Sequence, residues 1–524
     1  MPSGLVAIAI RTSDSVVLLA YLAGMWAVAF YFARRNTNTE QYFLGGRSFP
    51  GWALGMSMMA TSVSSVTFLA FPAAAYAGDL RDLVINLMLP IGIIFALLVC
   101  IPIFRRGRIT SAYEYLGARF GPIVRLYGTI SFTLLRICWL GVILCLISNV
   151  IVVLTGFPTT PVIIVTGIFV AVYTIVGGIE AVVWTDVLQT IILLTGGLLS
   201  LACLAIELPG GMGQIFDIGL ANDKFGLGPT TVSFHERTVW TAVILGVFSW
   251  IAFQTEQNMV QRYVAARSAR EARKATIIYG VIALPTWAFF FFVGVCLFVY
   301  FQVLPDDEVK ALTPEQIFPY FILTRLPPGV AGLVIAGVLS AAMSSVDSTL
   351  NAISAVTVVD IFKPYLARGR SDRFYLALAR GIAAAGALLM IGLAVLLSRI
   401  PTNTINELDW VIGSIFAGCI MGVFVLGFFT TRVDYAAALA GMAVAVLLNI
   451  YLVLGVVGWI PETWAIPVHK FWIGPMVNVV FMVVAYGTGC LRQRKVEDLA
   501  GLTIWTMEPA CTTERGEAEK SSSG

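Results

Sequence analysis

Long apolar runs follow one another along almost the whole chain, and each is about as long as a helix that crosses a membrane. Crossing the hydrocarbon core takes about 20 predominantly apolar residues. Thirteen runs reach this length, at residues 15–33, 50–77, 83–104, 122–154, 160–178, 184–207, 238–261, 275–303, 328–361, 375–398, 408–431, 433–457 and 471–491. The pattern predicts an all-α polytopic membrane protein with thirteen transmembrane helices.

The basic residues are concentrated in every second connection between these runs. With the N-terminus outside, about three quarters of the 33 Lys and Arg residues fall in cytoplasmic connections, as the positive-inside rule requires. The connection after the seventh run receives a group of five: Arg262, Arg267, Arg270, Arg273 and Lys274. Arg136 is the one basic residue placed within a span. We expect a multi-pass protein of the cell inner (plasma) membrane, with its C-terminus in the cytoplasm.

Composition agrees with this interpretation and excludes several classes of protein. Of the 524 residues, 58% are hydrophobic and 12% are charged, whereas a soluble domain carries roughly a quarter charged residues. A net charge of +3 does not suggest a nucleic-acid partner. Residues 1–497 form one transmembrane domain, and 498–524 a polar cytoplasmic tail that we expect to be disordered. His235 and His469 both lie in outside loops, so we expect neither a Ser-His-Asp triad nor an HExxH zinc site, and no enzyme.

Two spans are interrupted by polar residues in the middle of the membrane. The second contains MSMMATSVSSVTF, with Gly51 and Gly55 before it and Pro72 after it, and the seventh contains WIAFQTEQNMVQRY. Transporters bind substrate and ion at such breaks, where carbonyl oxygens and half-helix ends are exposed. The two interrupted spans are five apart, which is the spacing that an inverted five-plus-five repeat would produce.

A third polar group lies in the ninth span, in AAMSSVDSTLNAISAV. Ala341, Ser344, Ser345 and Ser348 share one helix face, and Asp347 borders it. Hard oxygen ligands of this kind suit a small cation, whereas the alternative is that the hydroxyls only help helices to pack. Charged residues cost about 2.5–3.5 kcal/mol at the centre of a span. Those placed within spans are therefore candidates for function, or for structural pairing between helices: Arg136, Asp186, Glu256 and Asp347.

The chain resembles the sodium/solute symporter family over nearly its whole length. The resemblance is carried by YFLGGRSFPGWALGMSMMATSVSSVTFL, TSAYEYLGARFG, YTIVGGIEAVVWTDVLQT, QRYVAAR and SAAMSSVDSTLNAISAVTVVDIF. It implies the leucine-transporter fold with an extra N-terminal helix and Na⁺ as the transported coupling ion. It implies a common sodium site at the carbonyls of Ala60, Val63 and Ala341 and the hydroxyls of Ser344 and Ser345. A second sodium site, used in some branches, is implied near Asp186, Ser345 and Ser348, and Asp347 resembles many bacterial members.

The resemblance gives less information about the substrate. The sugar-transporting branch has Glu-Gln at the positions of Val66 and Thr67, which argues against a glucose-type solute. The sialic-acid branch is more similar, with hydroxyls at Ser62, Ser64 and Thr67, but its carboxylate-binding Arg aligns with Trp139. Arg136 lies one helical turn earlier, and Asn86 is a further pocket candidate. Glu256 stands where bacterial relatives have Asp, so either the solute carries an amine or Glu256 braces the break.

We therefore expect a secondary active transporter that couples inward sodium flow to uptake of a small organic solute, such as a sialic-acid-like or other organic acid. The expected partners are that solute, sodium and the lipid bilayer, and the expected functional unit is a monomer. Proton coupling through Asp347 or Asp186 is one alternative. A membrane sensor that retains a transporter fold is another.

Overall fold

The structure is a computed structural model, and it describes residues 11–107, 109–400, 413, 416, 418–461, 463–492 and 499–507. Within these ranges the chain is helical and contains no strand beyond a single bridge between Phe49 and Ala266. Nine helices there are long and apolar enough to cross a membrane, or eleven if each of two bent helix pairs counts as one span. The chain is thus an all-α polytopic membrane protein, while the number thirteen stays a prediction.

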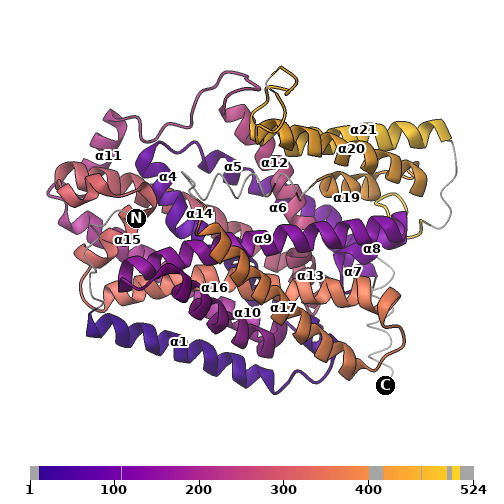
Figure 1. Ribbon diagram of the computed structural model, residues 1–524, viewed down its shortest axis with the longest axis horizontal. Coiled ribbons are helices and arrows are strands. Elements are labelled where there is room, and N and C mark those ends of the chain that lie inside the picture. Colours follow the sequence, from indigo (N-terminus) through magenta and orange to yellow (C-terminus); the bar gives the residue numbers. More distant parts are fainter. Residues whose placement is uncertain are drawn as a thin grey trace.

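The helices form one bundle, in which α1 (Thr12–Ala33) runs along one edge and α19 (Ile420–Phe429), α20 (Tyr435–Val456) and α21 (Ile473–Arg492) group at another (Figure 1). The other helices are α2 (Thr39–Leu44), α3 (Gly51–Ser62), α4 (Phe71–Ala77), α5 (Leu83–Leu87), α6 (Leu89–Phe95), α7 (Ile101–Arg106), α8 (Ala112–Phe120), α9 (Pro122–Thr155), α10 (Thr159–Glu207), α11 (Gly211–Ala221), α12 (Val239–Thr255), α13 (Gln257–Ala265), α14 (Ala269–Val303), α15 (Pro314–Arg325), α16 (Val330–Val356) and α17 (Asp372–Leu397). Short 3-10 or π segments are η1 (Gly45–Arg47), η2 (Val66–Ala70), η3 (Ala96–Cys100), η4 (Asp307–Ala311), η5 (Thr357–Leu366) and η6 (Lys470–Trp472).

Both interrupted spans are broken helices, as the polar clusters predict. The first is divided into α3 and η2–α4, which are bent by 61°, and the second into α12 and α13, bent by 48°. Val63 and Glu256 carry the breaks in extended backbone conformations, with ψ of 106° and 153°. The amide of a helical residue normally bonds the carbonyl four residues earlier, so each break leaves carbonyls without their usual partners.

α10 joins two predicted spans, 160–178 and 184–207, into one element of 49 residues. At 1.5 Å per residue it would be about 70 Å long, more than twice the roughly 30 Å hydrocarbon core. Gly178 divides it, with φ 64° and ψ −174°, which is not a helical conformation. The side chain of Asn36, just after α1, donates hydrogen bonds to the carbonyls of Val176 and Gly177 beside this division.

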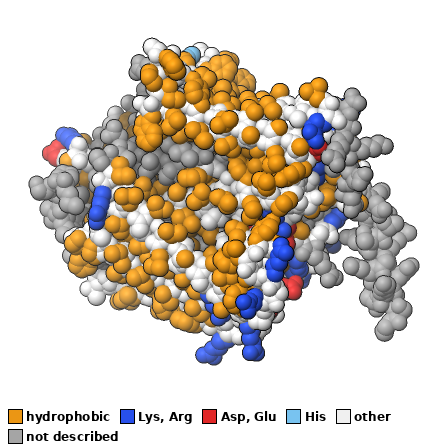
Figure 2. Space-filling view, turned by 45° about the vertical axis from the view of Figure 1, so that its right-hand side comes forward, with side chains coloured by type: hydrophobic (Ala, Val, Ile, Leu, Met, Phe, Trp, Pro, Cys, Tyr) orange, Lys and Arg blue, Asp and Glu red, His pale blue; other side chains and the backbone are white. Residues whose placement is uncertain are grey.

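α16 is the most enclosed of the long helices, and it packs along α10. α1, in contrast, exposes most of its surface. A space-filling view shows hydrophobic side chains over most of one face, with Lys and Arg side chains gathered mainly along its lower and right-hand margin (Figure 2). This distribution suits a molecule surrounded by hydrocarbon, with its charges near the ends of the spans.

Two predicted segments lie partly outside the described residues. Most of the predicted span 408–431 does, and only its end is seen, as α19. In the predicted tail, residues 499–507 lie against α8 and the end of α19. The Tyr115 hydroxyl donates to the Leu502 carbonyl at 2.9 Å, and the Ile504 amide donates to the Phe428 carbonyl at 3.0 Å. Residues 508–524 are outside the described part.

Candidate functional site

The first break and the hydroxyl face of α16 lie together. Ser344 Oγ donates to the Ala60 carbonyl at 2.9 Å, and Ser345 Oγ is 3.5 Å from the Thr61 carbonyl, which it also donates to. Both hydroxyls also lie 3.3 Å from the Ala341 carbonyl on their own helix. A continuous helix would have used the carbonyls of Ala60 and Thr61 internally, so it is the break that makes them available to α16.

These oxygen atoms have the chemistry and spacing of a cation site. An ion that holds oxygens at about 2.4 Å in an octahedral arrangement keeps neighbouring oxygens about 3.4 Å apart. The separations of 2.9–3.5 Å seen here are close to that spacing. Val63, the remaining residue of the implied set, is fully buried at the break. The hydroxyl of Ser65 is buried too, and it has no hydrogen-bond partner among the described residues. The residues present therefore fit a small cation.

A second polar cluster lies beside the first and centres on Asp186 of α10. Asp186 Oδ2 accepts a hydrogen bond from Ser57 Oγ of α3 at 2.5 Å, and Ser348 Oγ of α16 is 3.4 Å away. Thr61 Oγ1 lies 3.0 Å from Ser348 Oγ and so links this cluster to the first break. Asp186 Oδ1 is buried and has no hydrogen-bond partner within the described part of the chain. The structure thus brings Asp186 and Ser348 of the implied second site together and adds Ser57 and Thr61 of α3 to them, whereas Ser345 contacts the Thr61 and Ala341 carbonyls.

Asp347 faces the same interior but has different neighbours. Its Oδ2 accepts from the Tyr173 hydroxyl at 3.2 Å, and its Oδ1 accepts from the Ser348 amide at 2.7 Å. Both partners are neutral, and the side chain is fully buried. Tyr173 was not among the predicted site residues, because an apolar run with one Tyr gives no signal that its hydroxyl reaches another helix.

The positively charged partner of Asp186 lies where the sequence did not predict a basic residue. Arg262, expected in a cytoplasmic connection, is a fully buried residue of α13, and its Nη2 lies 3.2 Å from Asp186 Oδ2. Arg136 is therefore not the only basic residue within the spans. The hydropathy pattern placed Arg262 at the edge of the seventh run, but α13 is buried along its whole length. The polar positions of WIAFQTEQNMVQRY could have signalled a buried polar helix instead of a loop.

Arg136 and Glu256 pair with each other. They form a salt bridge between α9 and the second break, and the Arg136 guanidinium also lies over the ring of Trp139, 4.9 Å from its centroid. The rings of Phe132 and Phe253 lie close to the same group, with centroids at 6.0 Å and 5.8 Å. This is the helix-to-helix pairing that the sequence left open, and it places both charges in an aromatic surrounding.

Three of the other substrate candidates lie at the first break, and the fourth, Asn86, lies on α5. Ser62 Oγ donates to the Met59 carbonyl, and Ser64 Oγ accepts from the Val66 amide. Thr67 is buried on η2, and Asn86 is buried on α5. The structure brings the two breaks and α16 into one bundle, but it does not identify a shared pocket for these four residues and Arg136.

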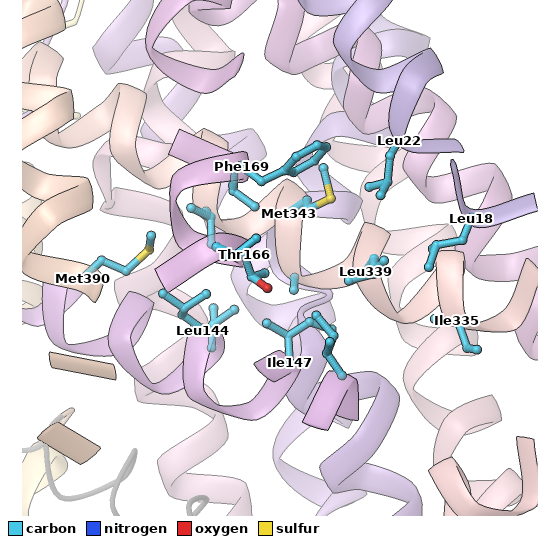
Figure 3. A pocket seen from close by; sticks show the side chains of 16 residues that line it. Leu18, Leu22, Leu144, Ile147, Thr166, Phe169, Ile335, Leu339, Met343 and Met390 are labelled. Atoms are coloured by element: carbon cyan, nitrogen blue, oxygen red, sulfur yellow. The ribbon is translucent and has the colours of Figure 1, made fainter. Parts of the chain in front are cut away.

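An apolar cavity of about 240 Å³ lies on the other side of α16 (Figure 3). Ile335, Leu339, Ala342, Met343 and Val346 form the α16 wall of this cavity, and α1, α9, α10 and α17 supply the rest. Thr166 is its single polar lining residue. A pocket without charges or convergent polar groups does not fit a charged solute. α16 thus separates an apolar face from the polar face of the candidate ion sites.

Comparison with known proteins places these features in a family. The sequence model of the sodium:solute symporter family matches residues 42–445. The sodium/sialic acid symporter SiaT of Proteus mirabilis is 34% identical over 437 residues, which cover 82% of this chain and 87% of that protein. The sodium/sialic acid symporter NanT of Aliivibrio fischeri is 31% identical over 485 residues, or 91% and 93% of the two chains.

A solved structure gives the same result for the fold. The substrate-bound, outward-open structure of a Na⁺-coupled sialic acid symporter superposes with a TM-score of 0.81 at 30% identity, covering 92% of this chain and 98% of that one. The leucine-transporter-type fold expected from the sequence is therefore confirmed, and so is a sodium-coupled transporter in place of an enzyme. The chain belongs to the sodium:solute symporter family.

Proposed function

We propose that sodium binds where the first break meets α16, and that it drives uptake of a small solute that carries a carboxylate. The observation that carries the proposal is the set of hydroxyl–carbonyl approaches between Ser344, Ser345 and the α3 end at Ala60 and Thr61. The proposed ligands are the carbonyls of Ala60, Val63 and Ala341 and the hydroxyls of Ser344 and Ser345. Asp186, Ser348 and Asp347 form a second candidate cation site, to which Arg262 already supplies a positive charge.

Alternating access follows from the position of this site. An ion shared by α3 and α16 would hold the broken span against α16, and solute binding near the break would then favour the same conformation. Sodium and solute would each bind more tightly in the presence of the other, because such coupling is reciprocal. Each sodium ion that enters through about 100 mV contributes roughly 2.3 kcal/mol before any concentration gradient.

The carboxylate proposal rests on Arg136 and on the named cargo of the relatives, since sialic acids carry a carboxylate. Arginine binds carboxylates with two parallel hydrogen bonds, which lysine cannot reproduce. In the proposed site, the solute carboxylate takes over the guanidinium from Glu256, and Ser62, Ser64, Thr67 and Asn86 supply hydrogen bonds to its other groups. Glu256 would then be able to bind an amine of the solute, or to pair with Arg136 again after the solute has left.

Membrane orientation and assembly complete the proposal. The alternation of basic residues supports an N-terminus outside and a cytoplasmic C-terminus in the plasma membrane, and inward sodium flow then means uptake. The acidic clusters lie within one bundle, which supports a functional monomer. Coupling to protons is the less favoured alternative, because the relatives are sodium-coupled and because the first-break site offers neutral oxygen atoms.

Thermal unfolding of the purified protein tests the carboxylate proposal. N-acetylneuraminic acid and pyruvate serve as anionic probes and glucose as an uncharged one, each in sodium chloride and in choline chloride. We expect an anionic probe to raise the unfolding temperature in sodium only. Arg136→Lys should abolish that shift while sodium alone still stabilises the protein.

A double variant separates solute binding from structural pairing. Arg136→Gln with Glu256→Gln removes both charges, so no buried charge is left unpaired. If the pair is only structural, the double variant should therefore fold and respond to the anion. If Arg136 binds the solute carboxylate, the double variant should fold and fail to respond. Recovery of the anion response in the double variant would contradict a role for Arg136 in solute binding. Stabilisation by sodium that is no greater than that by choline, in every variant and in the unmodified protein, would contradict the sodium proposal.

A further inference from the structure

Arg262 is fixed from four helices at the centre of the second candidate site. Its Nε donates to Ser57 Oγ on α3 at 2.9 Å, and its Nη2 donates to Ser348 Oγ on α16 at 2.7 Å. The same Nη2 lies 3.2 Å from Asp186 Oδ2 on α10, and Nη1 donates to the Asn258 carbonyl on α13 at 2.8 Å. The side chains of Arg262 and Asp186 are both fully shielded from solvent.

The guanidinium occupies the interactions that a second sodium ion would use. A cation between Asp186 and Ser348 would compete with Arg262 Nη2, which bonds both Asp186 Oδ2 and Ser348 Oγ. At the other carboxylate oxygen, Asp186 Oδ1, the cation would have to share one carboxylate with a buried like charge. If sodium displaced the guanidinium, that group would have to stay buried without its carboxylate. Leaving one partner of a buried ion pair uncompensated is strongly unfavourable.

The charges of the interior also balance with a single ion. Asp186 and Asp347 contribute two negative charges, and Arg262 contributes one positive charge. Among the residues that the structure describes, Asp347 has only the Tyr173 hydroxyl and the Ser348 amide as hydrogen-bond partners, so one negative charge remains. Asp347 and Ser344 are three residues apart on α16, which makes them neighbours on the helix surface. One sodium ion at Ser344 and Ser345 would complete the neutralisation.

We propose that the guanidinium of Arg262 takes the place of a second sodium ion, so that each chain binds one sodium ion at the first break. The proposal rests on the sodium function proposed above and specifies its stoichiometry. It assigns Asp186 as the counter-ion of Arg262 and not as a sodium ligand. Because Arg262 belongs to α13, the inner half of the second broken span carries a permanent cation that moves with it.

Equilibrium binding of radiolabelled sodium to the purified protein tests this stoichiometry. We expect one ion per chain for the unmodified protein and also for the neutral pair Arg262→Gln with Asp186→Asn. Arg262→Gln alone should bind two ions per chain, since it frees Asp186 and Ser348 for a second. Size-exclusion profiles and thermal unfolding verify that each variant is folded.

Two ions in the unmodified protein and one in the neutral pair would overturn the proposal, because Asp186 would then be a sodium ligand. If Arg262→Gln alone does not fold, the comparison of the unmodified protein with the neutral pair still decides between one and two ions. No sodium bound to the unmodified protein, or an unchanged count in Ser344→Ala, would contradict the sodium site itself. These outcomes distinguish failure of the stoichiometry from failure of the proposed function.

Discussion

The hydroxyl of Ser344 donates a hydrogen bond to the carbonyl of Ala60 at 2.9 Å, although 284 residues separate them in the chain. Ala60 belongs to the last turn of α3, which ends at the break at Val63. The amide four residues after Ala60 is therefore outside the helix and does not make the usual helical bond to the Ala60 carbonyl. The contact therefore depends on two local features at once, a hydroxyl on α16 and a helix that stops in the membrane.

Removing that hydroxyl should weaken sodium binding. For Ser344→Ala or Ser345→Ala we expect the sodium concentration for half-maximal stabilisation or uptake to rise about ten- to a hundredfold, because a hydrogen-bonding group that serves a charge is worth roughly 1.5–3 kcal/mol. Ser354→Ala is the matched control, since Ser354 Oγ donates to Asn351 of its own helix. An unchanged sodium dependence in both Ser344→Ala and Ser345→Ala would contradict the proposed sodium site.

Asp347→Asn should weaken sodium binding without changing the number of ions. Residues three apart on a helix are about 5–6 Å from each other, and at that distance, with an effective dielectric constant of about 20, one carboxylate contributes roughly 3 kcal/mol, or about a hundredfold in affinity. Sodium titration at constant ionic strength measures the effect. Equal affinity of the variant and the unmodified protein would show that this charge does not act on the ion.

Asp186→Asn should instead act on folding. It leaves the buried guanidinium of Arg262 without its carboxylate, and breaking a buried pair in this way costs about 3–5 kcal/mol. Thermal unfolding in the absence of sodium should therefore show a large loss of stability. Adding Arg262→Gln should recover most of it, and a double variant less stable than Asp186→Asn would argue against the pair.

Gly178→Ala should destabilise the division in α10. The combination of φ 64° and ψ −174° is available almost exclusively to glycine, and a Cβ there would lie 2.9 Å from Tyr42 and 3.0 Å from Asn36. We expect a loss of about 1–3 kcal/mol, seen as a lower unfolding temperature and a lower folded yield. Gly392→Ala in α17, where a Cβ meets no atom within 4 Å, is the control and should not be destabilised.

Much of the architecture could be predicted because its signals are local. Apolar length predicts spans, and a cluster such as Thr61, Ser62, Ser64 and Ser65 predicts a break, since hydroxyl side chains compete with the helix for backbone groups. The spacing of Ala341, Ser344, Ser345 and Ser348 predicts one polar face on α16. Each of these inferences needs only neighbours along the chain.

The pairing of charges could not be predicted in the same way. Arg262 reaches Asp186 only because α13 packs into the interior after the second break, and its place at the edge of an apolar run resembles that of a loop residue. For Arg136 the sequence left two alternatives, a solute carboxylate or a pair with Glu256 or another buried acid, and it could not decide between them because Glu256 is 120 residues away. Such pairs depend on long-range packing, which hydropathy does not describe.

The apolar cavity beside α16 has a mechanical consequence. A close-packed protein interior resists displacement because each side chain meets atoms on all sides. Leu339, Ala342, Met343 and Val346 instead border open space, while the opposite face of the same helix holds the hydroxyls proposed to bind sodium. The side chains on this face of α16 can therefore change their packing without driving atoms into overlap, which gives the transport cycle a place of low stiffness within a close-packed bundle.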